Sequence, residues 1–178
     1  MKVGKIAVRY ARALFLSAKE QGILEDVRKD MELILATVSD LPEVRSLLES
    51  PVVDTRKKTD ILVSVFDGKT GSLALDFIRL VTGNGREEYL AAICRHYIKL
   101  YKEEKGIKLA SIETAAPLTG EIRQEMLAVI TRAFNAEIEM QELIKKDLIG
   151  GFVLRVEDKQ LDLSVRGKLA RIKKELQK

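Results

Sequence analysis

The chain has 178 residues, 46% of them hydrophobic, which is enough apolar side chain for the core of one domain or of two small ones. Its 31 Lys and Arg against 27 Asp and Glu leave a net charge of +4, which is too small and too evenly spread to indicate a nucleic-acid-binding protein. A single cysteine, Cys94, excludes an internal disulfide framework.

The sequence also lacks the signals of a membrane-spanning or exported chain. No run approaches the roughly 18 to 20 apolar residues that a spanning helix needs. Residues 1–6 lack the apolar region of a secretory signal. We therefore expect a soluble protein that reaches a membrane only through partner subunits.

Apolar residues recur at helical spacing throughout the first part of the chain. Gly22, Asp67-Gly68 and Gly83-Asn84-Gly85 are placed to end helices, and Leu41-Pro42 interrupts the pattern. The connections between the helical segments are only a few residues long, which is typical of an all-α bundle. The pattern predicts six helices, over about residues 3–18, 24–38, 44–48, 55–66, 73–81 and 89–101.

The pattern changes at the charged segment that ends in Lys105-Gly106, and we place a domain boundary there. Residues 107–112 alternate like a strand, Thr119 is placed to cap a following helix, and a second strand is expected near residues 138–140. The predicted fold class is α+β. We expect a six-helix bundle over residues 1–105 and a small mixed α/β module with a C-terminal helix over residues 106–178.

The segment 148–169 carries the densest structural signals. Gly150-Gly151 permits a sharp bend, and residues 152–163 alternate around a turn predicted at Asp158-Lys159, which makes a hairpin. Ser164 stands where a helix N-cap belongs. The apolar residues that recur at helical spacing after it, among basic ones, are Val165, Leu169, Ile172 and Leu176.

No group of residues supports catalysis. Gly68-Lys69-Thr70 lacks the earlier glycine of a phosphate-binding loop, and Gly83-Asn84-Gly85 lacks the third glycine and the preceding strand of a dinucleotide site. His96 is the only histidine, and on one helix its side chain projects about 200° away from that of Cys94. We expect a non-catalytic protein without cofactor or metal. Short charged runs are expected to be solvated helix faces, among them Arg56-Lys57-Lys58 and Glu87-Glu88.

The first helix is apolar around about 220° of its circumference, whereas a helix packed on one core needs a stripe of roughly 100° to 140°. Ile6, Tyr10, Ala13 and Ser17 form one side of this arc, and Leu80 lies off the apolar stripe of the fifth helix. A groove between the two helices that accepts an amphipathic helix would explain both features. Alternatively, the first helix is central in its bundle, and the residues alone leave both interpretations open.

Three segments resemble motifs of one family, the delta subunit of F-type ATP synthase, called the oligomycin sensitivity conferral protein in mitochondria. Residues 149–169 are similar to its C-terminal signature, and residues 10–15 and 77–86 are similar to motifs on its first and fifth helices. One departure is Leu163, where relatives often have glycine. The resemblance favours the groove over the central helix.

The resemblance implies a stator subunit that links the F1 head to the peripheral-stalk b subunits and resists rotor torque during proton-driven ATP synthesis. It would be a monomer within a hetero-oligomeric complex, peripheral on the cytoplasmic face of the bacterial inner membrane, without direct membrane insertion and without nucleic acid. A helical adaptor outside ATP synthase and a basic nucleic-acid-binding protein are the alternatives.

The same resemblance implies two partner sites. The N-terminal helix of an alpha subunit would bind in a groove lined by Ile6, Tyr10, Ala13, Leu14, Ser17, Phe77, Leu80 and Val81. The b subunits would bind the C-terminal module at Gly150, Gly151, Ser164, Val165, Arg166, Gly167 and Leu169.

Overall fold

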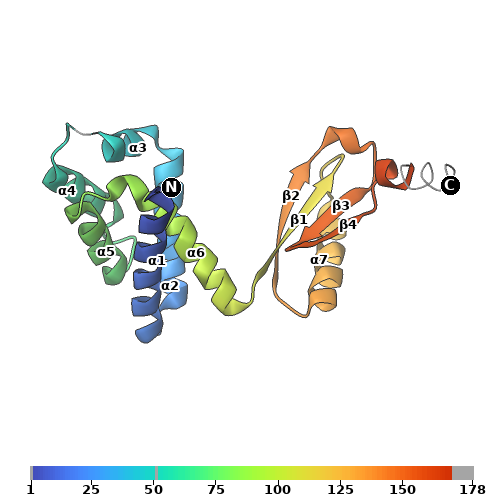
Figure 1. Ribbon diagram of the computed structural model, residues 1–178, viewed down its shortest axis with the longest axis horizontal. Coiled ribbons are helices and arrows are strands. Elements are labelled where there is room, and N and C mark those ends of the chain that lie inside the picture. Colours follow the sequence, from blue (N-terminus) through green and yellow to red (C-terminus); the bar gives the residue numbers. More distant parts are fainter. Residues whose placement is uncertain (1, 51, 170–178) are drawn as a thin grey trace. The chain divides into compact units, whose positions relative to one another are not determined.

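The computed structural model describes residues 2–50 and 52–169, and the chain divides into two compact units between Lys102 and Glu103 (Figure 1). The first unit is helical and the second combines a four-stranded sheet with helices. The predicted α+β class is therefore confirmed. Residues 51 and 170–178, which include Ile172 and Leu176 of the predicted terminal helix, lie outside the described part of the chain.

The first unit is not an exact six-helix bundle, because a 3₁₀ turn, η1, stands where the sixth helix was expected to begin. Tyr89 of this turn precedes Ile93 and Tyr97 at helical spacing, so the amphipathic pattern did not separate the turn from the helix that follows it. Within the described residues, the elements of this unit are α1 (Lys2–Glu20), α2 (Leu24–Asp40), α3 (Pro42–Glu49), α4 (Thr55–Phe66), α5 (Ser72–Gly83), η1 (Glu87–Tyr89) and α6 (Leu90–Lys105), which continues past the unit boundary at Lys102.

The core of the first unit lies where α1, α2, α5 and α6 bring their apolar stripes together. Met31, Ile34, Ile78 and Ile93 are completely buried there. Tyr97 is also completely buried, and its hydroxyl donates a hydrogen bond to the backbone carbonyl of Leu24 at 3.2 Å. The aromatic ring therefore fills the core while its polar end is satisfied by the start of α2.

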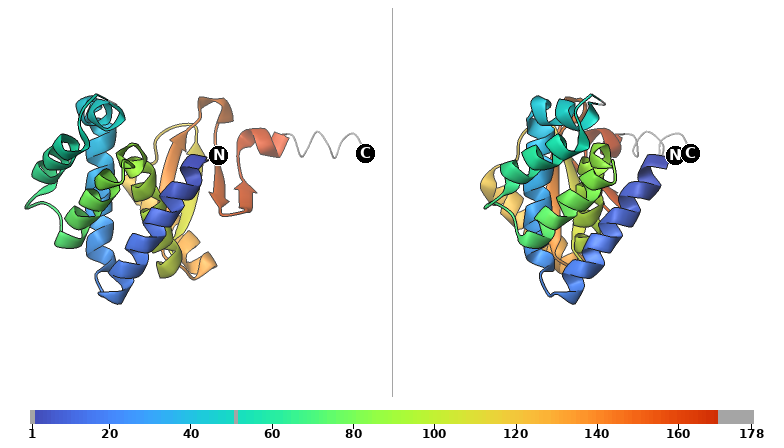
Figure 2. Two further views of the ribbon diagram at one scale, coloured as in Figure 1. Left: turned by 60° about the vertical axis from the view of Figure 1, so that its left-hand side comes forward. Right: turned by 90° about the vertical axis from the view of Figure 1, so that its left-hand side faces the viewer.

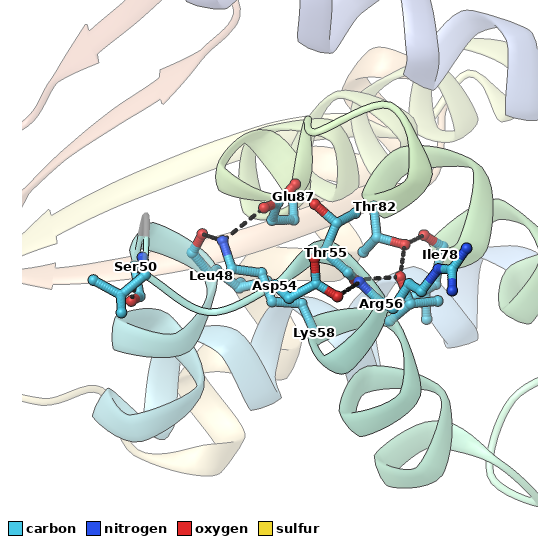
Figure 3. Close-up of polar contacts among 11 residues, drawn as sticks. Leu48, Ser50, Asp54, Thr55, Arg56, Lys58, Ile78, Thr82 and Glu87 are labelled. Atoms are coloured by element: carbon cyan, nitrogen blue, oxygen red, sulfur yellow. Dashed lines mark hydrogen bonds and ion pairs between the residues drawn. The ribbon is translucent and has the colours of Figure 1, made fainter.

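A buried ion pair ties three elements of this unit together (Figure 3). Lys58 on α4 and Glu87 on η1 are 5% and 7% exposed, and Nζ of Lys58 lies 2.7 Å from Oε1 of Glu87. The same Nζ donates to the carbonyl of Leu48 at the end of α3, at 3.1 Å. The prediction that both charges are solvated was wrong, because the packing of α3, α4 and η1 encloses two residues that are 29 positions apart.

The second unit is a four-stranded sheet with the strand order β2-β1-β3-β4, and α7 covers one face of it (Figures 1 and 2). Strand β1 is parallel to β2, which the α7 crossover requires, whereas β3 is antiparallel to both β1 and β4. The elements are β1 (Lys108–Thr114), α7 (Gly120–Phe134), β2 (Ile138–Ile144), η2 (Lys146–Leu148), β3 (Phe152–Val156) and β4 (Lys159–Asp162).

Local signals placed most of these elements, with one error in the hairpin. Thr119 caps α7 as predicted, since its hydroxyl accepts a hydrogen bond from the amide of Ile122. The hairpin turn, however, is at Glu157-Asp158 and not at Asp158-Lys159, because Lys159 already pairs with Val156. Glu157 adopts a φ of 52°, a left-handed conformation that no glycine signals in the sequence.

The Lys58–Glu87 pair should be critical for the stability of the first unit. Glu87→Ala is expected to lower the free energy of unfolding by about 3 to 5 kcal/mol, because it leaves the ammonium group buried without a counter-charge. Urea unfolding followed by circular dichroism measures this loss. Asp76→Ala is the control, since it breaks an exposed pair with Arg79 and should cost less than about 1 kcal/mol. Equal losses would contradict a structural role for the buried pair.

Candidate interaction surfaces

One side of α1 and the adjacent edge of α5 form the first candidate surface, which we call the α1–α5 surface. The rings of Tyr10 and Phe77 join the two helices edge to face, with centroids 6.3 Å apart. Ile6, Tyr10 and Ser17 are partly exposed, and Ala13 between them is exposed. Leu80, on α5, exposes 54% of its surface. A partly solvated apolar stripe on α1 thus lies beside an exposed leucine on α5.

Helix α1 lies along one side of its bundle and is not central in it (Figure 2). Its buried side consists of Ala7, Ala11, Leu14, Phe15 and Ala18. Val8, next to that side, and Leu16, farther around the helix, expose 45% and 49% of their surfaces. The structure therefore argues against a central first helix, because part of the apolar surface of α1 is not covered by its own unit. The groove stays a prediction.

Three residues predicted to line the groove lie in the core instead. Leu14, Phe77 and Val81 are 2%, 5% and 0% exposed, so they support the α1–α5 surface from beneath and cannot offer much area to a partner. The helical period points these side chains inward once the orientation of each helix is fixed. Conversely, the apolar arc predicted from the sequence included Val8 but left out Leu16, although an apolar residue among the polar ones of α1 was the available signal.

The signature segment of the second unit forms a tight junction between the hairpin and the C-terminal helix. Gly151 has a φ of 75°, and a Cβ there would clash with the carbonyl oxygen of Leu163 and lie 2.9 Å from Cα of Ser164. The hydroxyl of Ser164 donates to Oδ1 of Asp162 at 2.7 Å and accepts the amide of Gly167 at 2.9 Å. A Cβ on Gly167 would lie 2.5 Å from the Asp162 carboxylate. These residues fix the backbone path.

The predicted contact residues of this segment therefore divide into two groups. Gly151, Ser164 and Gly167 shape the junction, and Ser164 is 1% exposed, so it cannot touch a partner. Gly150 belongs with them, because its carbonyl accepts the amide of Val165 at 3.0 Å. Val165, Leu169 and Arg166 are exposed at the start of the C-terminal helix.

Exposed apolar side chains gather at this junction and form the second candidate surface, which we call the junction patch. Its members are Ile149, Val165 and Leu169, which expose 75%, 41% and 58% of their surfaces. The departure at Leu163 does not disturb the patch. Its amide donates to the carbonyl of Phe152 at 3.0 Å, and it is not among the described non-glycine residues with positive φ.

The structure offers no assembled catalytic group within residues 2–50 and 52–169. Burial raises the pKa of the Cys94 thiol to about 12, so it stays protonated and unreactive beside Met31. Gly68 and Gly85 each follow a helix, where their positive φ ends it. No cluster of three or more metal-ligating side chains is present in the described part of the chain.

None of the described helices combines the length and the hydropathy that a bilayer-spanning helix needs.

Comparison with known proteins gives a consistent result. The family model for the ATP synthase delta (OSCP) subunit matches residues 6–176. ATP synthase subunit delta of Cytophaga hutchinsonii is 32% identical over 173 residues, which cover 97% of this chain and 94% of that protein. The subunit delta of Carboxydothermus hydrogenoformans is 30% identical over 176 residues, which cover 99% of each protein.

Solved structures are also similar, for example one that matches over nearly the whole fold. A chain in the cryo-EM structure of the Toxoplasma gondii mitochondrial ATP synthase hexamer superposes with a TM-score of 0.75 and covers 97% of each chain. The sequence identity is 24%, so this likeness concerns the fold alone.

The junction should be intolerant of a side chain at Gly151. Gly151→Ala is expected to destabilise the second unit by about 2 kcal/mol or more, because it combines a left-handed φ with a backbone clash. Gly120→Ala is the control, since a Cβ at the start of α7 meets nothing within 4 Å. Urea unfolding monitored by circular dichroism measures both variants. An unchanged Gly151→Ala protein would show that the junction rearranges freely.

Proposed function

The chain belongs to the ATP synthase delta (OSCP) subunit family, and on this premise we propose that each of its two units binds a different part of that enzyme. It is a non-catalytic stator subunit of the peripheral stalk and part of the membrane-bound ATP synthase. The first unit binds the N-terminal helix of an alpha subunit in the F1 head. The second unit binds the b subunits of the stalk.

The observation that carries the first assignment is the exposed apolar stripe of α1 beside Leu80. An amphipathic helix buries its apolar face through anchors spaced at i, i+3, i+4 and i+7. Ile6, Tyr10, Ala13 and Ser17 have this spacing on α1. The small side chains at 13 and 17 allow a partner helix to approach closely, and Leu80 supplies the wall on the α5 side.

The second assignment rests on the junction patch. Val165 and Leu169 are one helical turn apart and lie on the same side of the C-terminal helix. The buried contacts of Ser164, Asp162 and Gly167 hold the start of that helix against the hairpin. Such a patch is rigid as well as apolar, which suits a contact that must hold against a steady force.

The mechanism is mechanical. Proton flow turns the rotor of an ATP synthase, and the catalytic head would turn with it unless the stalk held it still. The contacts on both units must therefore dissociate slowly under load, and buried apolar anchors mainly supply slow dissociation.

We also place the protein at the cytoplasmic face of a bacterial inner membrane. The similar delta subunits named above that come from Cytophaga and Carboxydothermus are bacterial, and they align over nearly their full length. The partners proposed above are other subunits, so attachment to the membrane passes through the complex.

Ala13→Arg should weaken binding of the alpha N-terminal peptide by about 2 kcal/mol or more, which is about thirtyfold in Kd. The exposed Ala13 can be replaced without disturbing the core, and the long charged side chain blocks the approach of the partner helix. Isothermal titration of the full chain measures the affinity. Ala36→Arg, the same change at an exposed position of α2, is the control and should bind normally. Equal affinities for both variants would contradict the α1–α5 assignment.

Val165→Asp should weaken binding of the C-terminal segment of the b subunit by about tenfold or more in Kd. A carboxylate at the first position of the C-terminal helix favours that helix, so loss of folding would not explain the effect. Val129→Asp is the control, because Val129 is an exposed valine on α7 of the same unit, 67% exposed. A larger loss with Val129→Asp would move the contact to α7.

A further inference from the structure

A basic hollow lies at one end of the α1–α5 surface. It has a volume of about 410 Å³ and is lined by Lys5, Ile6, Arg9, Tyr10 and Arg86. Two of its lining residues, Ile6 and Tyr10, also belong to the apolar stripe. Three cations and no acidic group therefore surround the point where the stripe ends.

The three cations of the hollow have no counter-charge within the described residues. Lys5, Arg9 and Arg86 are exposed, and none forms an ion pair or a side-chain hydrogen bond in the described part of the chain. Other arginines of the same unit are paired, for example Arg28, which lies 2.6 Å from Glu25 and 2.5 Å from Glu32. Three like charges gathered without an anion favour binding of a negative group.

Arg86 is held in this position from both sides along the chain. The amide of Gly85 donates to the carbonyl of Thr82 at 2.8 Å, and the amide of Arg86 donates to the carbonyl of Val81 at 3.0 Å. This is the Schellman arrangement, which needs the left-handed φ of 61° at Gly85. Glu87, the next residue, is anchored by Lys58 in the buried pair (Figure 3). The backbone on both sides of Arg86 therefore fixes its position beside the α1 residues that line the hollow.

The hollow also makes the two ends of the α1–α5 surface chemically different. Its α1 residues lie between Lys5 and Tyr10, whereas Ala13 and Ser17 continue the stripe toward the other end of α1. An amphipathic helix has two possible directions in a symmetric apolar groove. A cluster of cations at one end only favours the direction that brings partner carboxylates to that end.

We propose that the hollow formed by Lys5, Arg9 and Arg86 receives carboxylate side chains that flank the apolar stripe of the partner helix. The partner of the α1–α5 surface is then an acidic amphipathic helix that docks in one direction. This inference rests on the function proposed above and specifies the chemistry of its partner. The apolar stripe supplies affinity, and the basic hollow supplies association rate, register and direction.

The test measures binding of the alpha N-terminal peptide to the full chain at two ionic strengths. Arg86→Glu is expected to raise Kd by about three- to twentyfold at about 10 mM ionic strength, where charges interact over about 30 Å. At about 1 M salt the Kd values of the wild-type chain and of Arg86→Glu should differ by less than about twofold, because the screening length falls to about 3 Å. Arg56→Glu, an equal charge change at an exposed position of α4, is the control for the change in net charge. Arg86→Glu should raise Kd more than this control at low salt, and equal effects would overturn the proposal.

A second arm changes the peptide. A version with every Asp and Glu replaced by its amide should bind the wild-type chain and the Arg86→Glu variant equally. Such a peptide has no carboxylates that could distinguish arginine from glutamate at position 86. A peptide carrying Lys in place of one acidic residue should restore binding to Arg86→Glu. That rescue identifies the paired position and, with it, the direction of docking.

The outcomes separate this inference from the proposed function. If the wild-type chain does not bind the peptide at all, both fail together. If Ala13→Arg abolishes binding but Arg86→Glu binds like wild type at low salt, the α1–α5 assignment stands and the acidic-partner inference is overturned. Tighter binding of the wild-type chain to vesicles of anionic lipid than to the peptide, lost in Arg86→Glu, would assign the hollow to lipid headgroups and would also overturn it.

Discussion

Helix α1 carries more apolar surface than its own unit can bury, and this imbalance organises the first unit. One side of the helix is closed against the core by small residues such as Ala7, Ala11 and Ala18, which let the neighbouring helices come close. The adjacent side, through Ile6, Tyr10 and Ala13, stays at least partly solvated. Contiguous exposed apolar surface marks an interaction site or favours aggregation. A partner that covers the stripe, as we propose, would remove it from solvent.

In the second unit, hydrogen bonds and close backbone contacts join the hairpin to residues 165–169, the described start of the C-terminal helix. Gly151 permits contact with the chain at Leu163, and Asp162 and Ser164 satisfy the amide groups at the start of the helix. The glycines and the serine of the signature are therefore explained by backbone geometry. The side chains available to a partner are the apolar ones beside them.

Charge has two separate roles in the first unit. Inside, Lys58 and Glu87 neutralise each other and fix η1 against α3 and α4. Outside, Arg86 projects from the same turn into a group of cations that has no counter-charge in the described chain. The buried pair thus fixes the turn that carries the exposed Arg86. We expect a change in the pair or in Arg86 to alter the α1–α5 surface.

The sequence by itself determined which segments are helices and strands, because Gly22, Thr119 and the apolar period act locally. It also indicated the family through residues 149–169, and the family model that matches residues 6–176 confirms it. Only the tertiary structure decided which apolar residues remain exposed, as with buried Leu14 against exposed Leu16, because burial depends on the neighbours of each helix. The same holds for Arg86 beside Lys5 and for Lys58 beside Glu87. These residues are far apart in the chain, and no local pattern reports which distant segments packing will bring together.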